Sequence, residues 1–367
     1  MDTVWDQAFR GERAEAKGEA AAAILVDMRC SYDYEKFDHD LLADRARASQ
    51  FPSKILALAL AGYKAPRLIV SRGKAMAPLY ARRGVIAGCG LATTWVKVYC
   101  LSPLEAFAKR HPKVKLEAYI DDLTLSTTGP SDKNVEVRLV AAAKDLLEII
   151  TKELRCDLAY EKTAVIASND ELAATLAKRL ACTGAVPAAS TASLGVDLTC
   201  GRKRAAHKAS GVRKLRFAKG LKRMRRIRNI RQVIGGAKGG RVAAAGCMAA
   251  TEYGSAVNGV SDSELAKLQK IAASGMTPSA SGRSRTALFA TKGDPTWRAA
   301  VAPVLQWIQV AWRTNRMEGE TTKADLKAAW TETATRRTKL VSDDDTQRLR
   351  VILGADRVVF GRRDHAR

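Results

Sequence analysis

Short apolar runs separated by stretches of helical character mark the first two hundred residues. The run from Ala21 to Val26 is apolar without a break and predicts a buried strand, which ends at Asp27. Three later runs predict further strands: Val114 to Ile120, Leu123 to Ser126 and Tyr160 to Ala167. Three other segments are expected to be helical: 1–20, 38–63 with a break at Phe51-Pro52, and 134–154. This part of the chain should therefore mix strands with helices.

Two further patterns predict tight hairpins, and one helix shows its buried face. Leu68 to Ser71 and Met76 to Tyr80 flank Arg72-Gly73-Lys74, which has the composition of a turn. Ser193-Leu194-Gly195-Val196-Asp197 gives a shorter hairpin signal. In the helix expected over 134–154, the residues that recur at helical spacing should pack on a sheet: Leu139, Ala143, Leu146, Leu147, Ile150 and Leu154.

A glycine-rich stretch follows Arg82 and Arg83 and leads into a helix. It reads Gly84-Val85-Ile86-Ala87-Gly88-Cys89-Gly90. Glycine at these positions lets backbone approach a ligand closely, and the two arginines add positive charge beside it. An ordinary structural loop would have the same composition, so the stretch alone does not establish a ligand site.

Asp121 and Asp122 stand between two predicted strands, where aspartate fits the tip of a tight hairpin. Two adjacent carboxylates repel each other, and this repulsion raises a pKa unless a divalent cation neutralises both. Mg²⁺ prefers oxygen ligands from one or two carboxylates together with substrate phosphates. The hairpin is therefore a candidate metal site, and the alternative is a solvated Asp-Asp turn.

The stretch from Leu198 to Thr251 contains no acidic residue. It holds sixteen lysines and arginines between Arg202 and Arg241, against a net charge of +24 for the whole chain. Apolar residues recur at helical spacing within it and predict the buried face of an amphipathic helix: Val212, Leu215, Leu221, Met224, Ile227, Ile230 and Val233. A solvated helix face normally carries both signs of charge, so we expect contact with nucleic-acid backbone. The residues expected to make it are Lys214, Arg216, Lys222, Arg223, Arg225 and Arg226.

Residues 252–367 are expected to be mostly helical and carry no chemical motif. Helices are predicted around Asp262 to Ala273, Pro295 to Arg313, Lys323 to Arg337 and Asp343 to Val351. Gly275 to Arg285, rich in Ser, Gly and Pro, is the expected flexible linker.

Composition limits the function classes. A chain of 367 residues with 47% apolar residues is long enough for two or three domains. A net charge of +24 indicates a polyanionic partner, either nucleic acid or an anionic membrane surface. No apolar run of about 18 residues spans a bilayer. The charged N-terminal stretch and seven cysteines without a Cys-x-x-Cys pair predict an intracellular protein, nuclear or cytoplasmic, that is not secreted.

Taken in order, these motifs resemble the palm of a reverse transcriptase. The set comprises the strand that ends at Asp27 with Tyr32 five residues later, the glycine-rich turn, Tyr119-Ile120-Asp121-Asp122, the segment with Lys162, and Leu194-Gly195-Val196-Asp197. The stretches from Arg83 to Thr94 and from Tyr119 to Leu125 are similar to the non-LTR retrotransposon type. The resemblance implies an α+β fold with an antiparallel palm sheet of the split βαβ type packed on helices. It implies four regions: a helical segment 1–20, a palm 21–200, a basic thumb-like region 201–260 and a helical region 261–367.

The resemblance also implies a chemistry for individual residues. Asp27, Asp121 and Asp122 would hold two Mg²⁺ ions, with Mn²⁺ as a substitute, for transfer of a nucleotide to a primer 3′-hydroxyl. Lys162 would protonate the leaving pyrophosphate. The residues expected to bind the deoxynucleoside triphosphate and template are Tyr32, as the group that excludes a ribose 2′-hydroxyl, and Arg82, Arg83, Gly88 and Cys89. Leu194 and Gly195 would grip the primer. The implied partners are an RNA template, a DNA primer and deoxynucleoside triphosphates, with no membrane.

Three departures from the family pattern leave alternatives open. Ala87 stands where the family usually has Gln, which removes one side-chain contact. Asp33 offers a rival frame for the first metal ligand, although its aromatic follows after four residues, one short of the pattern. Relatives carry a fingers subdomain before the position of Asp27, whereas about 26 residues precede it here. The alternatives are a catalytically inactive relic that binds nucleic acid and, less favoured because Ile120 replaces a common Gly, an RNA-dependent RNA polymerase.

Overall fold

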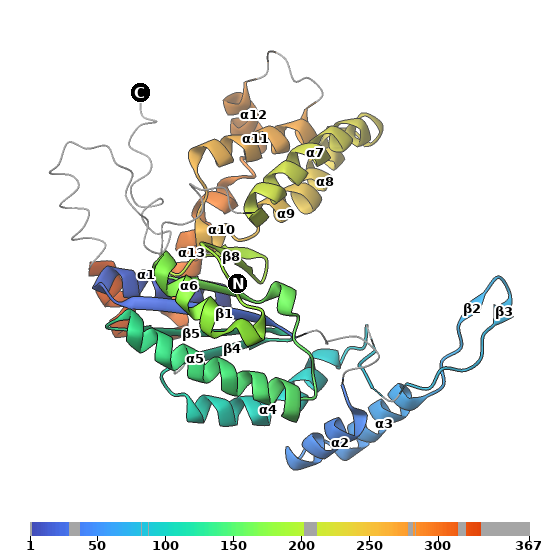
Figure 1. Ribbon diagram of the computed structural model, residues 1–367. Helices are drawn as coiled ribbons and strands as arrows, with labels where there is room; N and C mark the ends of the chain where they lie inside the picture. Colours follow the sequence, from blue (N-terminus) through green and yellow to red (C-terminus); the bar gives the residue numbers. More distant parts are fainter. Residues whose placement is uncertain are drawn as a thin grey trace. The chain divides into compact units, whose positions relative to one another are not determined.

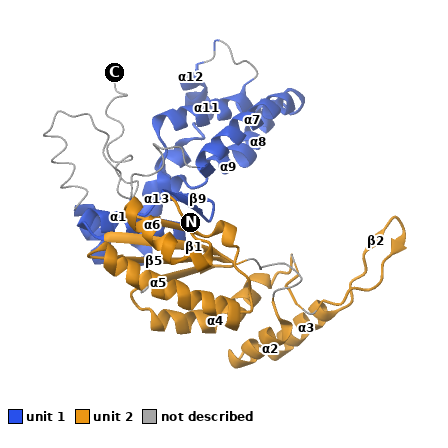
Figure 2. Cartoon of the chain, in the orientation of Figure 1, with its two compact units in different colours: residues 1–19, 189–367 blue, residues 20–188 orange. Residues whose placement is uncertain are grey.

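The computed structural model describes residues 2–28, 37–81, 83–86, 88–201, 211–277, 282, 284–314 and 321–331 (Figure 1). Internal contacts divide the chain into two compact units (Figure 2). One comprises residues 20–188, and the other comprises residues 1–19 together with 189–367. The predicted α+β class is confirmed, because a five-stranded mixed sheet is combined with many helices.

The unit of residues 20–188 is built on that five-stranded sheet. Its strands are β1 (Ala20–Asp27), β4 (Lys115–Tyr119), β5 (Asp122–Gly129), β6 (Ala164–Ala167) and β7 (Val186–Pro187). They lie in the order β4-β5-β1-β6-β7, and every neighbouring pair is antiparallel except β6 and β7. The central strand β1 is almost entirely buried, which explains its unbroken apolar sequence.

Three helices complete the layer beside the sheet: α4 (Ala92–Arg110), α5 (Asp132–Glu148) and α6 (Asp170–Arg179). Helix α5 begins where the Ser131 side chain accepts a hydrogen bond from the backbone N–H of Asn134. It continues into a π-helical turn, Ile149–Glu153, and packs on β1 and β5. Leu139, Leu146 and Ile150 are fully buried, as the helical spacing predicted. Burying one such side chain stabilises the fold by about 1.5–3 kcal/mol.

Helices α2 (His39–Ala48) and α3 (Ser53–Lys64) precede a small two-stranded ribbon. The Asp38 carboxylate caps α2 by accepting from the N–H groups of Asp40 and Leu41. Pro52 separates the two helices, as the sequence indicated. The ribbon consists of β2 (Val70–Ser71) and β3 (Lys74–Ala75), at the predicted hairpin (Figure 1).

The second unit joins the N-terminal helix to the C-terminal half of the chain. Helix α1 (Asp2–Lys17) contacts the hairpin β8 (Thr191–Ser193) and β9 (Val196–Leu198). The following helices are α7 (Gly211–Ile234), α8 (Gly236–Val242), α9 (Ala249–Glu252), α10 (Ser255–Asn258), α11 (Asp262–Met276), α12 (Arg285–Lys292) and α13 (Trp297–Thr314). Residues 323–331 are also helical. The helix predicted around Asp343 lies outside the described residues, as do residues 278–281 and 283 of the linker predicted over 275–285. The ends of that linker belong to helices, because α11 continues to Met276 and α12 begins at Arg285.

The buried face of α7 differs from the predicted one. Ile227 is buried and Leu221 and Met224 pack against the same core, as predicted, but Leu215, Ile230 and Val233 are exposed. Phe217, Gly220 and Arg231, which were not predicted, are buried. The contact runs through Gly220, where an added Cβ would lie 2.5 Å from the Thr251 hydroxyl. Glycine at position 220 therefore permits α7 to lie close to Thr251, and the buried stripe includes Gly220 and Phe217 in addition to the predicted Ile227.

The strand predicted from Tyr160 begins later than expected. Tyr160–Lys162 forms a 3₁₀ turn in which the N–H of Lys162 donates to the carbonyl of Ala159, and β6 starts at Ala164. Lys162 therefore precedes the strand. Among the described residues, no helix combines the length and apolar character needed to cross a bilayer.

Candidate active site

Strands β1 and β5 bring Asp27 and Asp122 together. Their antiparallel register pairs Ala20 with Gly129 at one end and Asp27 with Asp122 at the other. The N–H of Met28 donates to the carbonyl of Asp121 at 3.0 Å, which extends the pairing beyond the strand. The expected convergence of Asp27 with the Asp121-Asp122 hairpin is therefore present. Asp33, the rival first ligand, lies outside the described residues.

The hairpin between β4 and β5 has a two-residue turn, Ile120-Asp121. Tyr119 pairs with Asp122, and Ile120 has a φ of 59°. A β-branched residue in this left-handed region costs on the order of 1–3 kcal/mol, so the surrounding strands must hold it there. The strained residue directly precedes Asp121, and the turn fixes where the Asp121 carboxylate projects.

Negative charge gathers at this end of the sheet. Desolvation, followed by the charges of Asp121 and Asp27, raises the pKa of Asp122 above its usual range, while Lys162 opposes this shift. Lys162 Nζ lies 2.5 Å from Asp27 Oδ2. The hydrogen bond and the charge of Asp27 raise the pKa of Lys162, so that this ammonium stays protonated across the neutral range. One lysine faces three carboxylates, and the cluster keeps a negative potential.

The donor set fits a hard divalent cation. Asp27, Asp121 and Asp122 supply only carboxylate oxygens, the ligands that Mg²⁺ prefers. Neutralising them would remove the repulsion that raises the pKa of Asp122. No group of three acidic, histidine or cysteine side chains within the described residues has the arrangement of a preformed ion site. In this structure Lys162 occupies one oxygen of Asp27 instead.

The glycine-rich turn is held by two residues that the sequence did not single out. Buried His39 donates from Nε2 to the carbonyl of Gly84 at 2.8 Å, and the Tyr63 hydroxyl donates to the Cys89 sulfur at 3.1 Å. Their rings stack with centroids 5.8 Å apart. Burial lowers the pKa of His39, which keeps the ring neutral. A lone histidine and a lone tyrosine carry no motif, so only their contacts identify them.

The same turn leaves Gly88 open. Its φ is 87°, and an added Cβ would meet no atom within 4 Å. Arg83 is exposed and forms a backbone bridge with Asp38. Open space therefore surrounds the Cα of Gly88, and its role in binding a substrate stays a prediction. Tyr32 and Arg82 lie outside the described residues, so their predicted contacts stay predictions.

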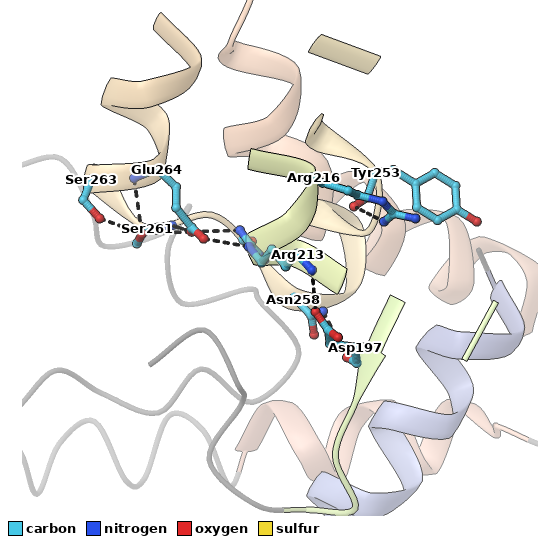
Figure 3. Close-up of polar contacts among 9 residues, drawn as sticks. Asp197, Arg213, Arg216, Tyr253, Asn258, Ser261, Ser263 and Glu264 are labelled. Carbon is cyan, nitrogen blue, oxygen red and sulfur yellow. Dashed lines mark hydrogen bonds and ion pairs between the residues drawn. The ribbon is translucent and has the colours of Figure 1, made fainter. Parts of the chain in front are cut away.

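In the other unit, the predicted grip residues form the tip of the β8–β9 hairpin. Leu194 and Gly195 have φ values of 46° and 74°, which fit a type I′ turn. The Tyr253 hydroxyl donates to the carbonyl of Leu194 at 3.1 Å. The Arg216 guanidinium lies 4.5 Å from the centroid of the Tyr253 ring and donates to the Tyr253 carbonyl at 3.2 Å (Figure 3). Arg216, expected to bind nucleic acid, is thus already engaged with the protein.

Helix α7 is anchored at its first turn. The Asp197 carboxylate accepts from the backbone N–H groups of Val212 and Arg213 at 3.4 and 3.0 Å. The Arg213 guanidinium donates to both oxygens of Glu264 at 2.7 and 2.8 Å, and Glu264 also accepts from Ser261 at the start of α11 (Figure 3). An aspartate at a helix N-terminus and a bidentate ion pair together fix the orientation of α7.

The anchored helix presents its cations to solvent. The exposed basic residues lie opposite the buried face, and they are Lys214, Lys219, Lys222, Arg223, Arg225 and Arg226. Arg231 is instead buried and donates to the carbonyls of Ser274 and Thr277. Of the basic residues predicted to bind nucleic acid, Arg216 alone packs against a described ring. The others are exposed and form the basic face of α7, although Arg223 also donates to the carbonyl of Gly246 at 3.3 Å.

Comparison with known proteins gives structural similarity without a family. No protein-family model and no curated protein matches the chain. It is similar to apo telomerase from Candida tropicalis truncated from the C-terminal domain, with a TM-score of 0.39 and 16% identity over 55% of this chain and 38% of that one. It is also similar to telomerase from the same organism in complex with a fragment of telomeric RNA (TM-score 0.44, 12% identity, 89% of this chain) and to the apo form (0.42, 12%, 95%). The chain spans 52% and 56% of the length of these last two.

Proposed function

We propose that the chain is an RNA-directed DNA polymerase of a retroelement of the non-LTR type. The observation that carries the proposal is the register of β1 and β5, which brings Asp27 opposite Asp122 with Asp121 in the adjoining turn. Carboxylates paired in this way, next to a lysine and in the same unit as a glycine turn with open backbone, suit transfer of a nucleotide to a hydroxyl.

Each residue of the acidic cluster has a role in this proposal. Asp27, Asp121 and Asp122 would hold two Mg²⁺ ions, which supply charge neutralisation and activation of the attacking hydroxyl when bound. Lys162 lies beside Asp27 in the acidic cluster and would donate a proton to the departing pyrophosphate. His39 and Tyr63 keep the glycine turn in place for the incoming deoxynucleoside triphosphate.

The second unit would hold the nucleic acid. The exposed basic face of α7 neutralises phosphates of the RNA template and DNA primer without reading bases. The Leu194-Gly195 tip would contact the primer, and its position relative to α7 is fixed through Tyr253 and Arg216.

Primer extension tests the proposal. The full chain is given an RNA template, a DNA primer, Mg²⁺ and either deoxynucleotides or ribonucleotides. We expect extension with deoxynucleotides that falls by at least a thousandfold in Asp121→Asn and Asp27→Asn. Asp44→Asn is the matched control, because Asp44 is exposed and forms an ion pair with Arg47, one turn further along the same helix. Extension that survives both site substitutions, or that prefers ribonucleotides, would contradict the proposal.

A further inference from the structure

The β2–β3 ribbon stands out because its side chains are exposed. Arg67 and Leu79 form a backbone bridge at its base, and the N–H of Met76 donates to the carbonyl of Ile69 at 3.0 Å. Arg72 and Gly73 have φ values of 51° and 75°, which close the tip as a type I′ turn. All residues from 68 to 80 are exposed.

The exposed side chains of the ribbon are largely apolar. Those that a globular protein would ordinarily bury are Leu68 (60% exposed), Ile69 (49%), Val70 (65%), Met76 (61%), Leu79 (48%) and Tyr80 (70%). Two strands are only marginally stable without a surface to cover. Contiguous exposed apolar side chains of this kind mark an interaction site.

The charge around the ribbon identifies the kind of partner. No aspartate or glutamate occurs between Asp44 and Glu105, while that stretch holds ten lysines and arginines. Arg72 and Lys74 are exposed at the ribbon tip. Lys74 pairs with Ser71, and Met76 lies opposite Ile69, so these four side chains share one face because cross-strand partners do. That face combines a cation with an apolar pair.

We propose that the β2–β3 ribbon is a nucleic-acid-binding element that inserts into a groove of a duplex. The minor groove of an A-like RNA–DNA duplex is wide and shallow, so a two-stranded ribbon can lie in it. Cations at the ribbon tip would reach phosphates, and the apolar side chains would pack against sugars and base edges. The element lies in residues 20–188 and is separate from the basic face of α7. This inference rests on the proposed function for the identity of the duplex, which would be the template–primer. Binding of the duplex by the ribbon requires no catalysis.

Charge complementarity selects a duplex over a second copy of this chain. Two copies that paired ribbon to ribbon would bring two acid-free basic segments together, and like charges at an interface oppose association. A duplex supplies the anions that the segment lacks.

The test is binding of a fluorescent RNA–DNA duplex to the full chain at several salt concentrations. Two variants separate charge from packing: Arg72→Gln with Lys74→Gln, and Ile69→Ser with Met76→Ser. All four side chains are exposed, so the fold should tolerate the changes. Lys109→Gln with Lys144→Gln is the control, because both lysines are exposed on α4 and α5.

The charge variant should lower affinity about tenfold and reduce the slope of log K against log salt by about 1–2, because each phosphate contact contributes about 0.9. The apolar variant should lower affinity with the slope unchanged. Parent-like binding by both variants would overturn the inference, as would an equal loss in the control. Self-association through the ribbon would also overturn the inference. It would be shown if the unchanged chain is oligomeric in sedimentation while the apolar variant is monomeric and binds the duplex normally. Binding is measured without deoxynucleotides, so a chain that binds duplex through the ribbon but extends no primer would contradict the polymerase proposal alone.

Discussion

The Nζ atom of Lys162 lies 2.5 Å from Oδ2 of Asp27, although the 3₁₀ turn that contains Lys162 and the end of strand β1 at Asp27 are far apart in the sequence. The ammonium is exposed and the carboxylate is partly buried. This pair occupies the end of β1 where Asp122 also lies. Lys162 therefore lies within the acidic cluster, at a position from which its ammonium could contact a substrate bound there.

Replacing Lys162 by Met should slow primer extension by roughly 10²–10³-fold in the rate of the chemical step, because a positioned proton donor contributes that much. Primer–template affinity should stay within about twofold. Single-turnover extension and a binding titration separate the two. Lys152→Met removes a comparable exposed ion pair with Glu148 and should leave the rate unchanged. A loss confined to binding would rule out the proton-donor role.

The Arg213–Glu264 ion pair makes stability depend on pH. Burial raises the pKa of Glu264, but the charge of Arg213 and the hydrogen bonds from Ser261 outweigh it, so the folded pKa lies below 4.5. A depressed carboxyl pKa stabilises the fold above the unfolded value, and this contribution is lost as pH falls through the folded value. Glu264→Gln should cost about 2 kcal/mol at pH 7 and progressively less below about pH 4.5. Urea unfolding of the parent and of Glu264→Gln, at pH 7 and at a pH below about 4.5, measures this difference in the free energy of unfolding. Glu105→Gln, at an exposed position, should show neither effect.

Alanine substitutions at Gly195 and Gly18 would separate the cost of backbone strain from the cost of a steric contact. Both have a φ near 70°, but an added Cβ meets Arg216 Nη2 at 2.8 Å only at Gly195. Gly18→Ala should cost about 1–2 kcal/mol from strain alone. Gly195→Ala should cost more than that and should displace Arg216 from the Tyr253 ring. Thermal unfolding together with Tyr fluorescence checks both effects, and equal costs would show that the Arg216 contact carries no weight.

The exposed basic face of α7 should bind duplex backbone without reading sequence. Changing Lys222, Arg223, Arg225 and Arg226 together to Gln should reduce the slope of log K against log salt by about 3–4. The loss should be similar for duplexes of unrelated sequence. Lys109, Lys133, Lys144 and Lys152, changed together, provide a control of equal charge on exposed positions. An unaltered slope in the α7 variant would assign its charge to another partner.

Local patterns predicted the strands of the site better than they predicted its contacts. The end of β1 at Asp27 and the hairpin at Asp121 follow from neighbouring residues, and both are present. The sequence predicts Lys162 at the start of a strand over Tyr160 to Ala167, whereas the hydrogen bond from the Lys162 N–H to the carbonyl of Ala159 makes a 3₁₀ turn there. The pairing of Lys162 with Asp27 depends on the β1–β6 register, which no local pattern contains.

Two other results depend on packing rather than on pattern. Helix α7 carries apolar residues on more than one side. Its contact with Thr251 at Gly220 determines which side is buried. Leu215, Ile230 and Val233 could equally have formed the buried stripe by spacing alone. His39 and Tyr63 were missed because each acts through a tertiary contact, with Gly84 and Cys89 respectively.

Binding of Mn²⁺, followed by electron paramagnetic resonance, tests most directly whether Asp27, Asp121 and Asp122 form one divalent-ion site. The account predicts that the full chain binds Mn²⁺, that Mg²⁺ displaces it, and that Asp27→Asn and Asp121→Asn each weaken binding at least tenfold while Asp44→Asn does not. Binding that is absent from the full chain in the presence of primer–template and deoxynucleotide, or that is unaffected by either site substitution, would contradict it.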